Sequence, residues 1–505
     1  MTANSYGGGP VRRPLGPNIA RVGLALSVAF GALAAGAGYW QVARSAPLSA
    51  APDNPAVVAA TRKALRGRIV DRNGTILADN KRDANGEPYR VYRDPSMSQV
   101  IGYASRQFGT VGLERTYDAE LVGSVRPDPV ADLLKKFEPD PFDPQQLTLS
   151  ISLPLQRAAV KALGNDRGAV IMLDPKTGEV LALASTPTYD ASTITDPDTG
   201  ADAFAKLLKD KRLPFLPRGT QGRYVPGSVF KIVTALAGLG SGSINPDTTY
   251  PQQPKSEKDG LVVSGFRIHD GHHLVTGAKA LDFYEATEVS CNIWYALTGL
   301  ETGGENLAAT AKQLGFGDNP PFDLPLGASQ VTNGGGNFGG GFKDSVELAN
   351  ASYGQAETVV TPFQMALVAA AVANDGVLMQ PHIVTSLTGK KSGTRKIDAS
   401  VWRRIVSGGV ASDIQQAMQR AVEGPLGRQF TSGAKVSGVP TAGKSGTAEL
   451  GGSGEPNSWF IGFAPVDDPQ VAIAVVVEQG GRGGERAAPL AGDMMTLALK
   501  TLAGG

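Results

Sequence analysis

The chain contains one long apolar stretch near its start. Residues 22–40 carry no charged side chain over 19 residues, enough to cross about 30 Å of hydrocarbon as a helix. Three arginines precede it, so the positive-inside rule predicts that residues 1–21 are cytoplasmic and the rest of the chain extracytoplasmic. Small residues at 49–51 allow a cleaved signal peptide instead. We favour a retained anchor in contact with membrane lipid, because the stretch is long for a signal core and ends in two aromatic residues.

The next hundred residues predict a small domain beside the membrane. Residues 41–60 are rich in Ala, Pro and Ser and indicate a spacer. Residues 66–77 predict a strand, an Asn-Gly turn and a second strand, and residues 109–121 predict a compact turn followed by a helix. Prolines among charged residues over 124–145 indicate a domain boundary. We therefore expect a cytoplasmic tail (1–21), a membrane anchor (22–40), a juxtamembrane pedestal of the dimerisation-domain kind (41–145) and one large domain (146–505).

The large domain has a pattern typical of an α/β (α+β) fold. Helical periodicity marks 155–163 and 490–502. Apolar or alternating runs predict strands at 147–152, 168–174, 179–184, 458–464 and 471–477. Because these strands lie towards the two ends of the domain, we expect one antiparallel sheet flanked by helices, with a helical lobe inserted between its distant segments.

Composition narrows the classes of function. Of the 505 residues, 41% are hydrophobic and 19% are charged, as in ordinary globular proteins. The net charge of +1 gives no general attraction to polyanions, so we expect no nucleic-acid partner. The single cysteine, Cys291, excludes an intramolecular disulfide.

The first of three short polar strings is Ser228-Val229-Phe230-Lys231. Ser228 opens an apolar helical run, where free N–H groups favour a developing anion. Lys231 follows on the same helix face. A buried lysine near other cations has a lowered pKa and can take the proton of a serine. Taken alone, the two residues would more simply be a helix cap and a solvated lysine.

The second string is Ser290-Cys291-Asn292, at the start of another helical run. Alternation places Ser290 and Asn292 on one side and Cys291 on the other. A hydroxyl can relay a proton there, and an amide can hold a substrate carbonyl. We expect Cys291 to be a small buried hydrophobic residue rather than a thiol nucleophile.

The third string is Lys444-Ser445-Gly446. It ends a full match, residues 438–445, to the phosphate-binding P-loop pattern, which requires a buried strand before it and a helix after it. The residues before it are polar and glycine-spaced, and those after it cannot open a helix. We therefore predict a strand that enters a hairpin. On a strand, Lys444 can face a carboxylate and Gly446 allows close approach to the backbone.

Other candidate sites are weaker. Residues 269–273 contain three histidines, but in a polar loop without the spacing of a metal site, so we predict a solvated loop, no metal and no cofactor. The glycine-rich residues 334–341 lack the flanking strand and helix of a nucleotide fingerprint. No Gly-x-Ser-x-Gly string occurs, which argues against an ordinary α/β-hydrolase.

Together, the three strings resemble the serine–lysine, serine–amide and lysine–glycine motifs of penicillin-binding proteins and serine β-lactamases. The second string has Cys where that motif has Asp, and the third has Ser where it has Thr, and neither change removes a functional group. Further strings resemble class B penicillin-binding proteins, the monofunctional D,D-transpeptidases of peptidoglycan. They are Arg66-Gly67, Asp71-Arg72-Asn73-Gly74, Gly112-Leu113-Glu114, Tyr224-Val225-Pro226-Gly227, Gly354-Gln355, Thr361-Pro362, Ala373-Asn374-Asp375-Gly376 and Trp459-Phe460-Ile461-Gly462. The resemblance is specific over 147–503 and looser over 66–123.

The resemblance implies that Ser228 attacks the D-Ala-D-Ala amide of a stem peptide, with Lys231 as its base. Ser290 and Lys444 would pass the proton to the departing D-alanine. The substrate-binding residues would be Asn292, Ser445, Gly446 and Thr447. The N–H groups of Ser228 and Thr447 would form the oxyanion hole. β-Lactam antibiotics would acylate Ser228, and a membrane glycosyltransferase of the cell-wall machinery would be a partner.

Two other functions stay open on this fold. A β-lactamase or β-lactam sensor is disfavoured, because a lactamase needs no juxtamembrane domain and no cytoplasmic signalling domain is expected before the anchor. A catalytically silent scaffold for cell-wall synthesis is disfavoured by the intact serines and lysines. Transpeptidation and carboxypeptidase hydrolysis share one acyl-enzyme, so both are compatible with the motifs.

Overall fold

The computed structural model describes residues 16–39, 65–123, 143–270, 279–427, 431–449 and 454–504. These residues belong to two units: a smaller one that includes the N-terminal helix, and a larger one formed by residues 65–124 and 143–505. Several predictions fall outside the described residues, namely those for the spacer at 41–60, most of the segment 124–145, and His272 and His273.

The N-terminal helix α1 (Gly16–Gly38) covers most of the predicted apolar stretch. Its window Ala20–Ala37 has a mean hydropathy of 1.6, so the helix is long and apolar enough to cross a membrane. The coarse prediction of one N-terminal apolar helix is confirmed, and its orientation stays a prediction.

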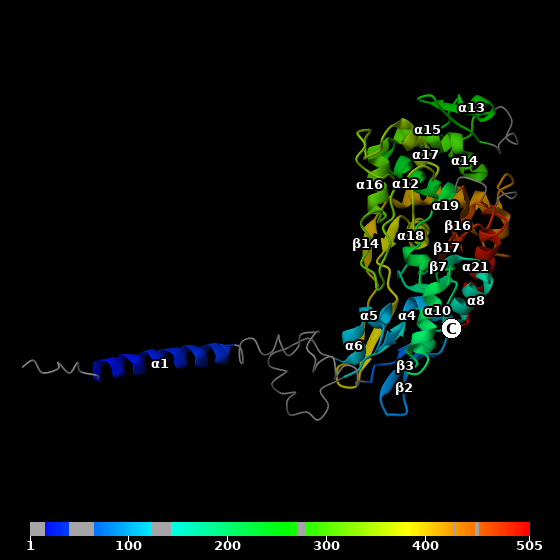
Figure 1. The fold of residues 1–505 in the computed structure, drawn as a ribbon. Helices are drawn as coiled ribbons and strands as arrows, with labels where there is room; N and C mark the ends of the chain where they lie inside the picture. Colours follow the sequence, from blue (N-terminus) through cyan, green and yellow to red (C-terminus); the bar gives the residue numbers. More distant parts are fainter. Residues whose placement is uncertain are drawn as a thin grey trace, which may run out of the picture. The chain divides into compact units, whose positions relative to one another are not determined.

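A five-stranded antiparallel sheet forms the centre of the larger unit (Figure 1). Its strand order is β15 (Ala442–Ala448), β16 (Asn457–Ala464), β17 (Val471–Val477), β7 (Gly168–Leu173) and β8 (Val180–Thr186). These strands are almost continuously buried, because helices cover both faces of the sheet. The predicted sheet of distant chain segments is confirmed for the strands predicted at 168–174, 179–184, 458–464 and 471–477. The strand predicted at 147–152 was wrongly placed in it, because Gln146–Leu149 pairs in a second sheet instead.

Helices pack on both faces of this sheet. On one face, α8 (Leu153–Leu163) and α21 (Ala487–Ala503) contribute a core that includes Leu155, Val475 and Met495. On the other face lie α11 (Arg218–Gln221) and α18 (Pro362–Ala373), whose twelve residues are all buried. The strands can be apolar on both faces because each face has its own helical cover.

A helical lobe is inserted between β8 and β15, as predicted. Its helices are α12 (Lys231–Ser241), α13 (Gln253–Asp259), α14 (Phe283–Val289), α15 (Asn292–Thr302), α16 (Gly304–Gln313), α17 (Ser345–Ala351) and α19 (Gly408–Glu423). A hairpin of β9 (Leu261–Val263) and β10 (Phe266–Ile268) follows α13 within the lobe. Helix α19 packs on both α14 and β15, and so ties the lobe to the edge of the sheet.

A second sheet crosses the boundary predicted near residue 145. Its order is β13 (Gly393–Lys396), β12 (Val384–Gly389), β6 (Gln146–Leu149), β1 (Ile69–Val70), β2 (Ile76–Arg82) and β3 (Pro88–Tyr92). Strand β1 pairs antiparallel with β2, across the predicted Asn-Gly turn, and parallel with β6. The sheet therefore joins the N-terminal strands to the large domain, and the domain limits themselves stay a prediction.

The single helix predicted to end near residue 121 is two short helices. They are α5 (Leu113–Thr116) and α6 (Asp118–Val122), and Tyr117 between them leaves the helical conformation. The hydroxyl of Tyr117 donates to the carboxylate of Asp323, far along the sequence. This tertiary bond holds the residue at the break, which the local pattern could not indicate.

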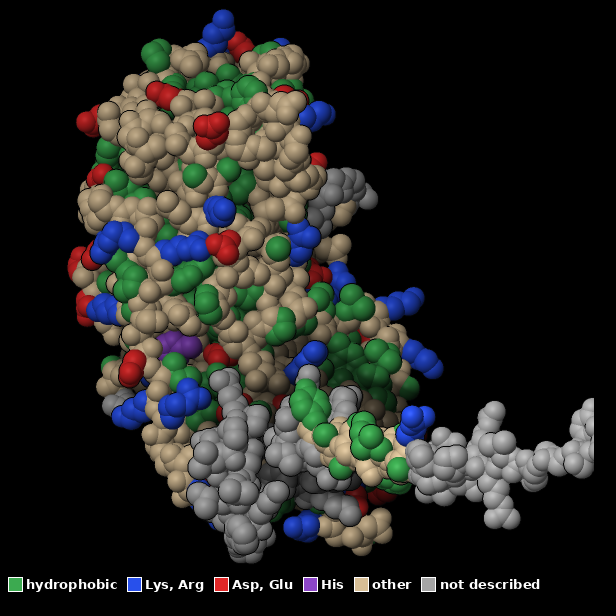
Figure 2. Space-filling model, turned by 90° about the vertical axis from the view of Figure 1, so that its left-hand side faces the viewer, with side chains coloured by type: hydrophobic (Ala, Val, Ile, Leu, Met, Phe, Trp, Pro, Cys, Tyr) green, Lys and Arg blue, Asp and Glu red, His purple; other side chains and the backbone are tan. Residues whose placement is uncertain are grey.

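Shorter elements complete the larger unit. They are η2 (Pro95–Met97), α4 (Ser98–Ile101), β4 (Ala104–Ser105), β5 (Gly109–Thr110), α9 (Ala191–Thr195), α10 (Gly200–Lys209), η3 (Gly227–Phe230), β11 (Val377–Met379), β14 (Val401–Arg404) and η4 (Ser432–Ala434). On the face of this unit shown in Figure 2, basic and acidic side chains are interspersed, in keeping with the near-zero net charge.

Candidate active site

Ser228 and Lys231 meet where a tight turn enters a buried helix. Ser228 lies in η3, and Lys231 is the first residue of α12. The Lys231 Nζ donates to the Ser228 Oγ at 3.0 Å. Lys231 is fully buried, whereas Ser228 is partly exposed to the cleft. The predicted pair is therefore in direct contact, with its serine accessible and its amine shielded from water.

Two glycines let strand β15 approach the Ser228 turn. Gly227 has φ +58°, and a Cβ on it would lie 2.6 Å from the carbonyl oxygen of Thr447. A Cβ on Gly446 would lie 2.9 Å from the carbonyl oxygen of Pro226. The absence of a side chain at Gly446 thus brings the strand against the nucleophile turn, a protein contact that the sequence did not indicate.

Ser290 and Asn292 lie at the junction of two helices. Ser290 ends α14 in the left-handed conformation, with φ +63°, and Asn292 begins α15. The Lys231 Nζ donates to the Ser290 Oγ at 3.1 Å and to the Asn292 Oδ1 at 2.7 Å. The second string therefore faces the first through the amine of Lys231.

Lys444 completes the polar cluster from the edge of the main sheet. Its Nζ donates to the Ser290 Oγ at 2.8 Å and to the Ser445 carbonyl oxygen at 3.0 Å. Its strand β15 pairs along its whole length with β16 as a hairpin, so the P-loop alternative is excluded. The hydroxyl of Ser290 accepts from both lysines, and a continuous path runs from Ser228 through Lys231 and Ser290 to Lys444.

Burial lowers the pKa of both lysine side chains. For Lys231 the loss of solvation lowers the pKa to about 8, while the carboxylate of Asp270 opposes the shift. For Lys444 burial lowers the pKa well below its ordinary value, and the charge of Lys231 lowers it further. Both amines are therefore tuned towards a neutral form that can accept a proton.

Cys291 points away from the cleft, as predicted for a buried small residue. It is 0% exposed, its Sγ accepts from the Trp294 N–H at 3.2 Å, and its thiol donates to Glu257 at 3.1 Å. Burial raises the pKa of this thiol well above its ordinary value. The thiol therefore stays protonated and caps α15 instead of acting as a nucleophile.

The prediction of a solvated loop at 269–273 was wrong for Asp270, which is buried at 8% exposure. Asp270, Glu257 and Cys291 bring three ligand-type atoms within 4.8 Å of one another. The Cys291 thiol donates a hydrogen bond to Glu257, and the Asp270 carboxylate accepts one from the backbone N–H of Asn292. We therefore assign this cluster a structural role and not a metal.

The chain matches two family models that together cover most of its length. Residues 168–496 match the penicillin-binding protein transpeptidase domain, and residues 66–138 match the penicillin-binding protein A dimerisation domain. The peptidoglycan D,D-transpeptidase PbpA of Mycolicibacterium smegmatis is 33% identical, over 96% of this chain and 99% of the relative. The protein of the same name from Mycobacterium tuberculosis is 31% identical, over 91% of this chain and 94% of the relative.

A solved structure is similar to this chain as well. It is the ceftriaxone acyl-enzyme complex of penicillin-binding protein A from M. tuberculosis, with a TM-score of 0.77 and 29% identity, over 88% of this chain and 100% of that one. The chain belongs to the class B penicillin-binding proteins. The resemblance found in the motifs and the expected fold are thereby confirmed.

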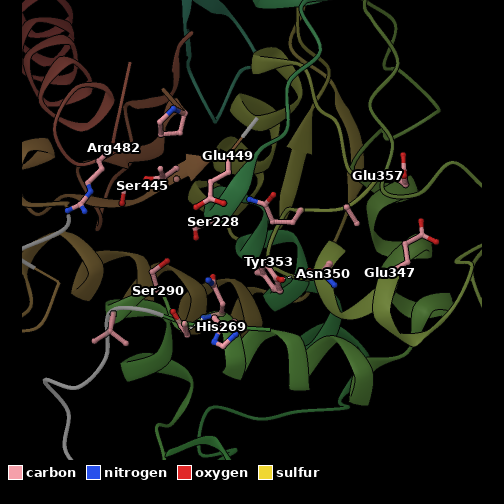
Figure 3. Close-up of a pocket in the computed structure, with 18 of the residues that line it drawn as sticks. Ser228, His269, Ser290, Glu347, Asn350, Tyr353, Glu357, Ser445, Glu449 and Arg482 are labelled. Carbon is pink, nitrogen blue, oxygen red and sulfur yellow. Dashed lines mark hydrogen bonds between the residues drawn. The ribbon is translucent and has the colours of Figure 1, made fainter. Parts of the chain in front are cut away.

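The cleft of this penicillin-binding protein has a volume of about 1360 Å³, and Ser228 lies in its wall. Figure 3 shows Ser290 and Ser445 on one side of Ser228, and Tyr353 and Asn350 on the other. The predicted substrate-binding residues Asn292, Ser445, Gly446 and Thr447 all line it. The structure thus gathers these four residues and the serines around one opening, with the two lysines buried beneath it.

Motif reasoning missed several residues that line the same cleft. They are Asp270, Asn350, Tyr353, Glu449 and Arg482. Each belongs to a loop or a helix end, and the fold brings it to the cleft from a distant part of the chain. Among them, Asp270 accepts a hydrogen bond from the backbone N–H of Asn292, at the start of α15.

Proposed function

We propose that this protein is a serine-type peptidoglycan D,D-transpeptidase that acts through an acyl-enzyme on Ser228. The observation that carries the proposal is the path of hydrogen bonds from Ser228 through Lys231 and Ser290 to Lys444. It offers a nucleophile, a base and a route for one proton. The matching relatives named D,D-transpeptidase support the same activity.

In the first half-reaction, the neutral amine of Lys231 takes the proton of the Ser228 hydroxyl. The Ser228 Oγ then bonds to the carbonyl carbon of the penultimate D-alanine, and the N–H groups of Ser228 and Thr447 hold the oxyanion. As the amide C–N bond breaks, Ser290 and Lys444 deliver a proton to the departing D-alanine. The contacts of 3.1 and 2.8 Å at the Ser290 Oγ suit this relay.

In the second half-reaction, the amine of a neighbouring stem peptide attacks the acyl-enzyme and restores Ser228. Attack by water instead would give a carboxypeptidase product from the same intermediate. Asn292 would orient the donor, while Lys444, Ser445 and Thr447 would bind its terminal carboxylate next to Gly446. A β-lactam would acylate the same serine and give an acyl-enzyme like the one solved for penicillin-binding protein A of M. tuberculosis.

The proposal extends to the setting of the enzyme. Helix α1 would be a retained anchor in lipid, with the N-terminus in the cytoplasm and the catalytic unit outside. Residues 41–145 would be the juxtamembrane pedestal and residues 146–505 the transpeptidase domain. Because the described cleft supplies acyl-transfer chemistry, we assign polymerisation of the glycan strand to a separate membrane glycosyltransferase.

Covalent labelling with fluorescent penicillin tests the nucleophile. We expect the wild type to be labelled and Ser228→Ala to be unlabelled. Ser241→Ala is the matched control, because Ser241 is an exposed serine at the end of helix α12, which follows the Ser228 turn, and it should be labelled like the wild type. A folded wild type that takes no label would overturn the proposal.

The lifetime of the labelled enzyme separates transpeptidase from β-lactamase. We expect the acyl-enzyme to persist for hours, whereas a β-lactamase would release hydrolysed drug rapidly. The enzyme is then incubated with a stem-peptide donor and an added amine, and the amounts of cross-linked and hydrolysed peptide are measured. Cross-linked product supports transpeptidation, and hydrolysed peptide alone would assign carboxypeptidase activity.

A further inference from the structure

Asp270 lies behind the catalytic cluster, at the N-terminus of helix α15. It follows strand β10 and is 8% exposed. Its Oδ2 accepts from the backbone N–H of Asn292 and, at 3.3 Å, from that of Ile293. A carboxylate in this place satisfies N–H groups that have no partner inside the helix and complements the helix dipole.

Asn292, whose backbone N–H donates to Asp270, also contacts Lys231 through its side chain. The Asn292 Oδ1 accepts from the Lys231 Nζ at 2.7 Å, and the Ser290 carbonyl oxygen accepts from the same nitrogen at 2.5 Å. These two acceptors belong to the junction of α14 and α15, which Asp270 stabilises through its hydrogen bonds to the start of α15. A shift of the start of α15 would therefore move the acceptors that aim the Lys231 amine at Ser228.

Asp270 also provides a negative charge close to the buried Lys231. Lys231 and Lys444 are both buried and both contact the Ser290 Oγ, and burying two cations together is costly without a nearby anion. The carboxylate of Asp270 opposes the burial-driven fall in the pKa of Lys231. Among the described residues, titratable groups near Lys231 or Asp270 include Glu257 of α13, Cys291 and Tyr295 of α15, and Tyr353 after α17.

We propose that Asp270 is a positioning residue for acyl transfer, one that anchors Asn292 at the start of α15 and balances the charge of the buried lysine pair. The proposal rests on Ser228 acylation as the protein's function. Asp270 acts through Asn292 and Lys231, and its carboxylate takes no part in bond making.

A set of substitutions separates this role from that of a plain helix cap. Asp270→Asn keeps an acceptor oxygen and removes the charge, whereas Asp270→Ala removes both. Asp270→Glu keeps the charge and serves as the conservative rescue. Asp259→Asn is the matched control, because Asp259 is an exposed aspartate of the same lobe that ends α13 outside the cleft.

The readout is the second-order rate of acylation by fluorescent penicillin between pH 6 and pH 10, with the full chain in detergent. Loss of the negative charge lowers the pKa of Lys231, so the neutral base persists to lower pH. For Asp270→Asn we expect the acidic limb of the profile to move down by about one pH unit. Asp270→Glu and Asp259→Asn should keep the wild-type limb. For Asp270→Ala we also expect the maximal acylation rate to fall about 10–100-fold, because the start of α15 no longer holds the acceptors that orient the Lys231 amine.

Thermal unfolding of each variant is measured alongside. If Asp270 were only a helix cap, its substitution would lower the Tm but would leave the acidic limb of the pH profile unchanged. An unmoved limb in folded Asp270→Asn, or an unchanged maximal rate in Asp270→Ala, would overturn the positioning role. Failure of the wild type itself to be acylated is a different outcome, and it would overturn the proposed function instead.

Discussion

At the scale of single residues, the two active-site lysines differ in what they reach. Lys231 contacts the nucleophile Ser228 and three acceptors of the second string, while Lys444 contacts Ser290 and its own strand. We therefore assign the first proton transfer to Lys231. Burial and the opposing charge of Asp270 set its pKa at about 8.

This assignment predicts a pH dependence. The protonated amine cannot act as a base, so at pH 7 about a tenth of Lys231 is competent. The acylation rate should rise with pH through about 8 and level off above it. Stopped-flow acylation of the wild type across pH 6 to 10 measures this profile. A rate that falls as the pH rises from 6 to 8 would contradict Lys231 as the base.

The sequence predicted these residues unevenly. Ser228, Lys231, Ser290 and Lys444 were recognised because a serine–lysine spacing on a helix and a lysine beside glycine are local patterns. Asp270 was taken for part of a solvated loop. Its role depends on the distance between that loop and α15, and no local pattern records such a distance.

At the scale of elements, a buried ionic cluster fastens the N-terminal strands. Glu114 of α5 is 0% exposed and accepts from Arg66 Nε at 2.7 Å and from Arg90 Nε at 2.5 Å. The Tyr92 hydroxyl donates to the same carboxylate at 3.2 Å. Burial opposes ionisation, yet the two arginines hold the pKa of Glu114 below its ordinary value.

Removing this carboxylate should be costly. Glu114→Gln leaves the buried Arg90 guanidinium without its counter-ion and leaves Arg66 paired with Asp118 alone, and we expect a loss of about 3–5 kcal/mol in the free energy of unfolding. Asp118→Asn is the matched control, because Asp118 pairs with the same Arg66 but its side chain is 44% exposed, so its loss should cost under about 1 kcal/mol. Denaturant unfolding of both variants provides the test. Equal losses would show that burial does not govern the strength of this cluster.

Elements were predicted well where their periodicity was strong. The strands at 168–174, 458–464 and 471–477 were clear because both faces are buried and nearly every position is apolar. The break at Tyr117 was missed, because a hydrogen bond to the distant Asp323 holds it. Local propensity cannot report a partner two hundred residues away.

At the scale of the whole molecule, the orientation across the membrane is open to a direct test. The native Cys291 is buried, so an introduced cysteine can be labelled selectively with a membrane-impermeant maleimide. We expect Asp198→Cys, an exposed position of the catalytic unit, to be labelled in intact spheroplasts. Ser5→Cys should be labelled after lysis only.

Two results would contradict this orientation. Labelling of Ser5→Cys before lysis would reverse the topology. Absence of Ser5→Cys label even after lysis, with a shortened chain on a gel, would identify a cleaved signal peptide. The wild type serves as the background control for residual reaction at Cys291.

By itself, the sequence predicted the family and its acyl-transfer chemistry, because residue types that can attack a carbonyl and relay a proton occur in three short strings that resemble the motifs of penicillin-binding proteins. It also predicted the five strands of the central sheet, although not shorter strands such as β3 and β14, and it predicted which helix is apolar enough for a membrane. The tertiary structure decided which groups meet: the turn of Ser228 against Gly446, the hydroxyl of Ser290 between two lysines, and Asp270 beneath Asn292. These contacts join segments far apart in the chain, and their distances and burial set the pKa of the base. These distances, the burial and the pKa depend on how distant segments pack together, and no local pattern in the sequence predicts that packing.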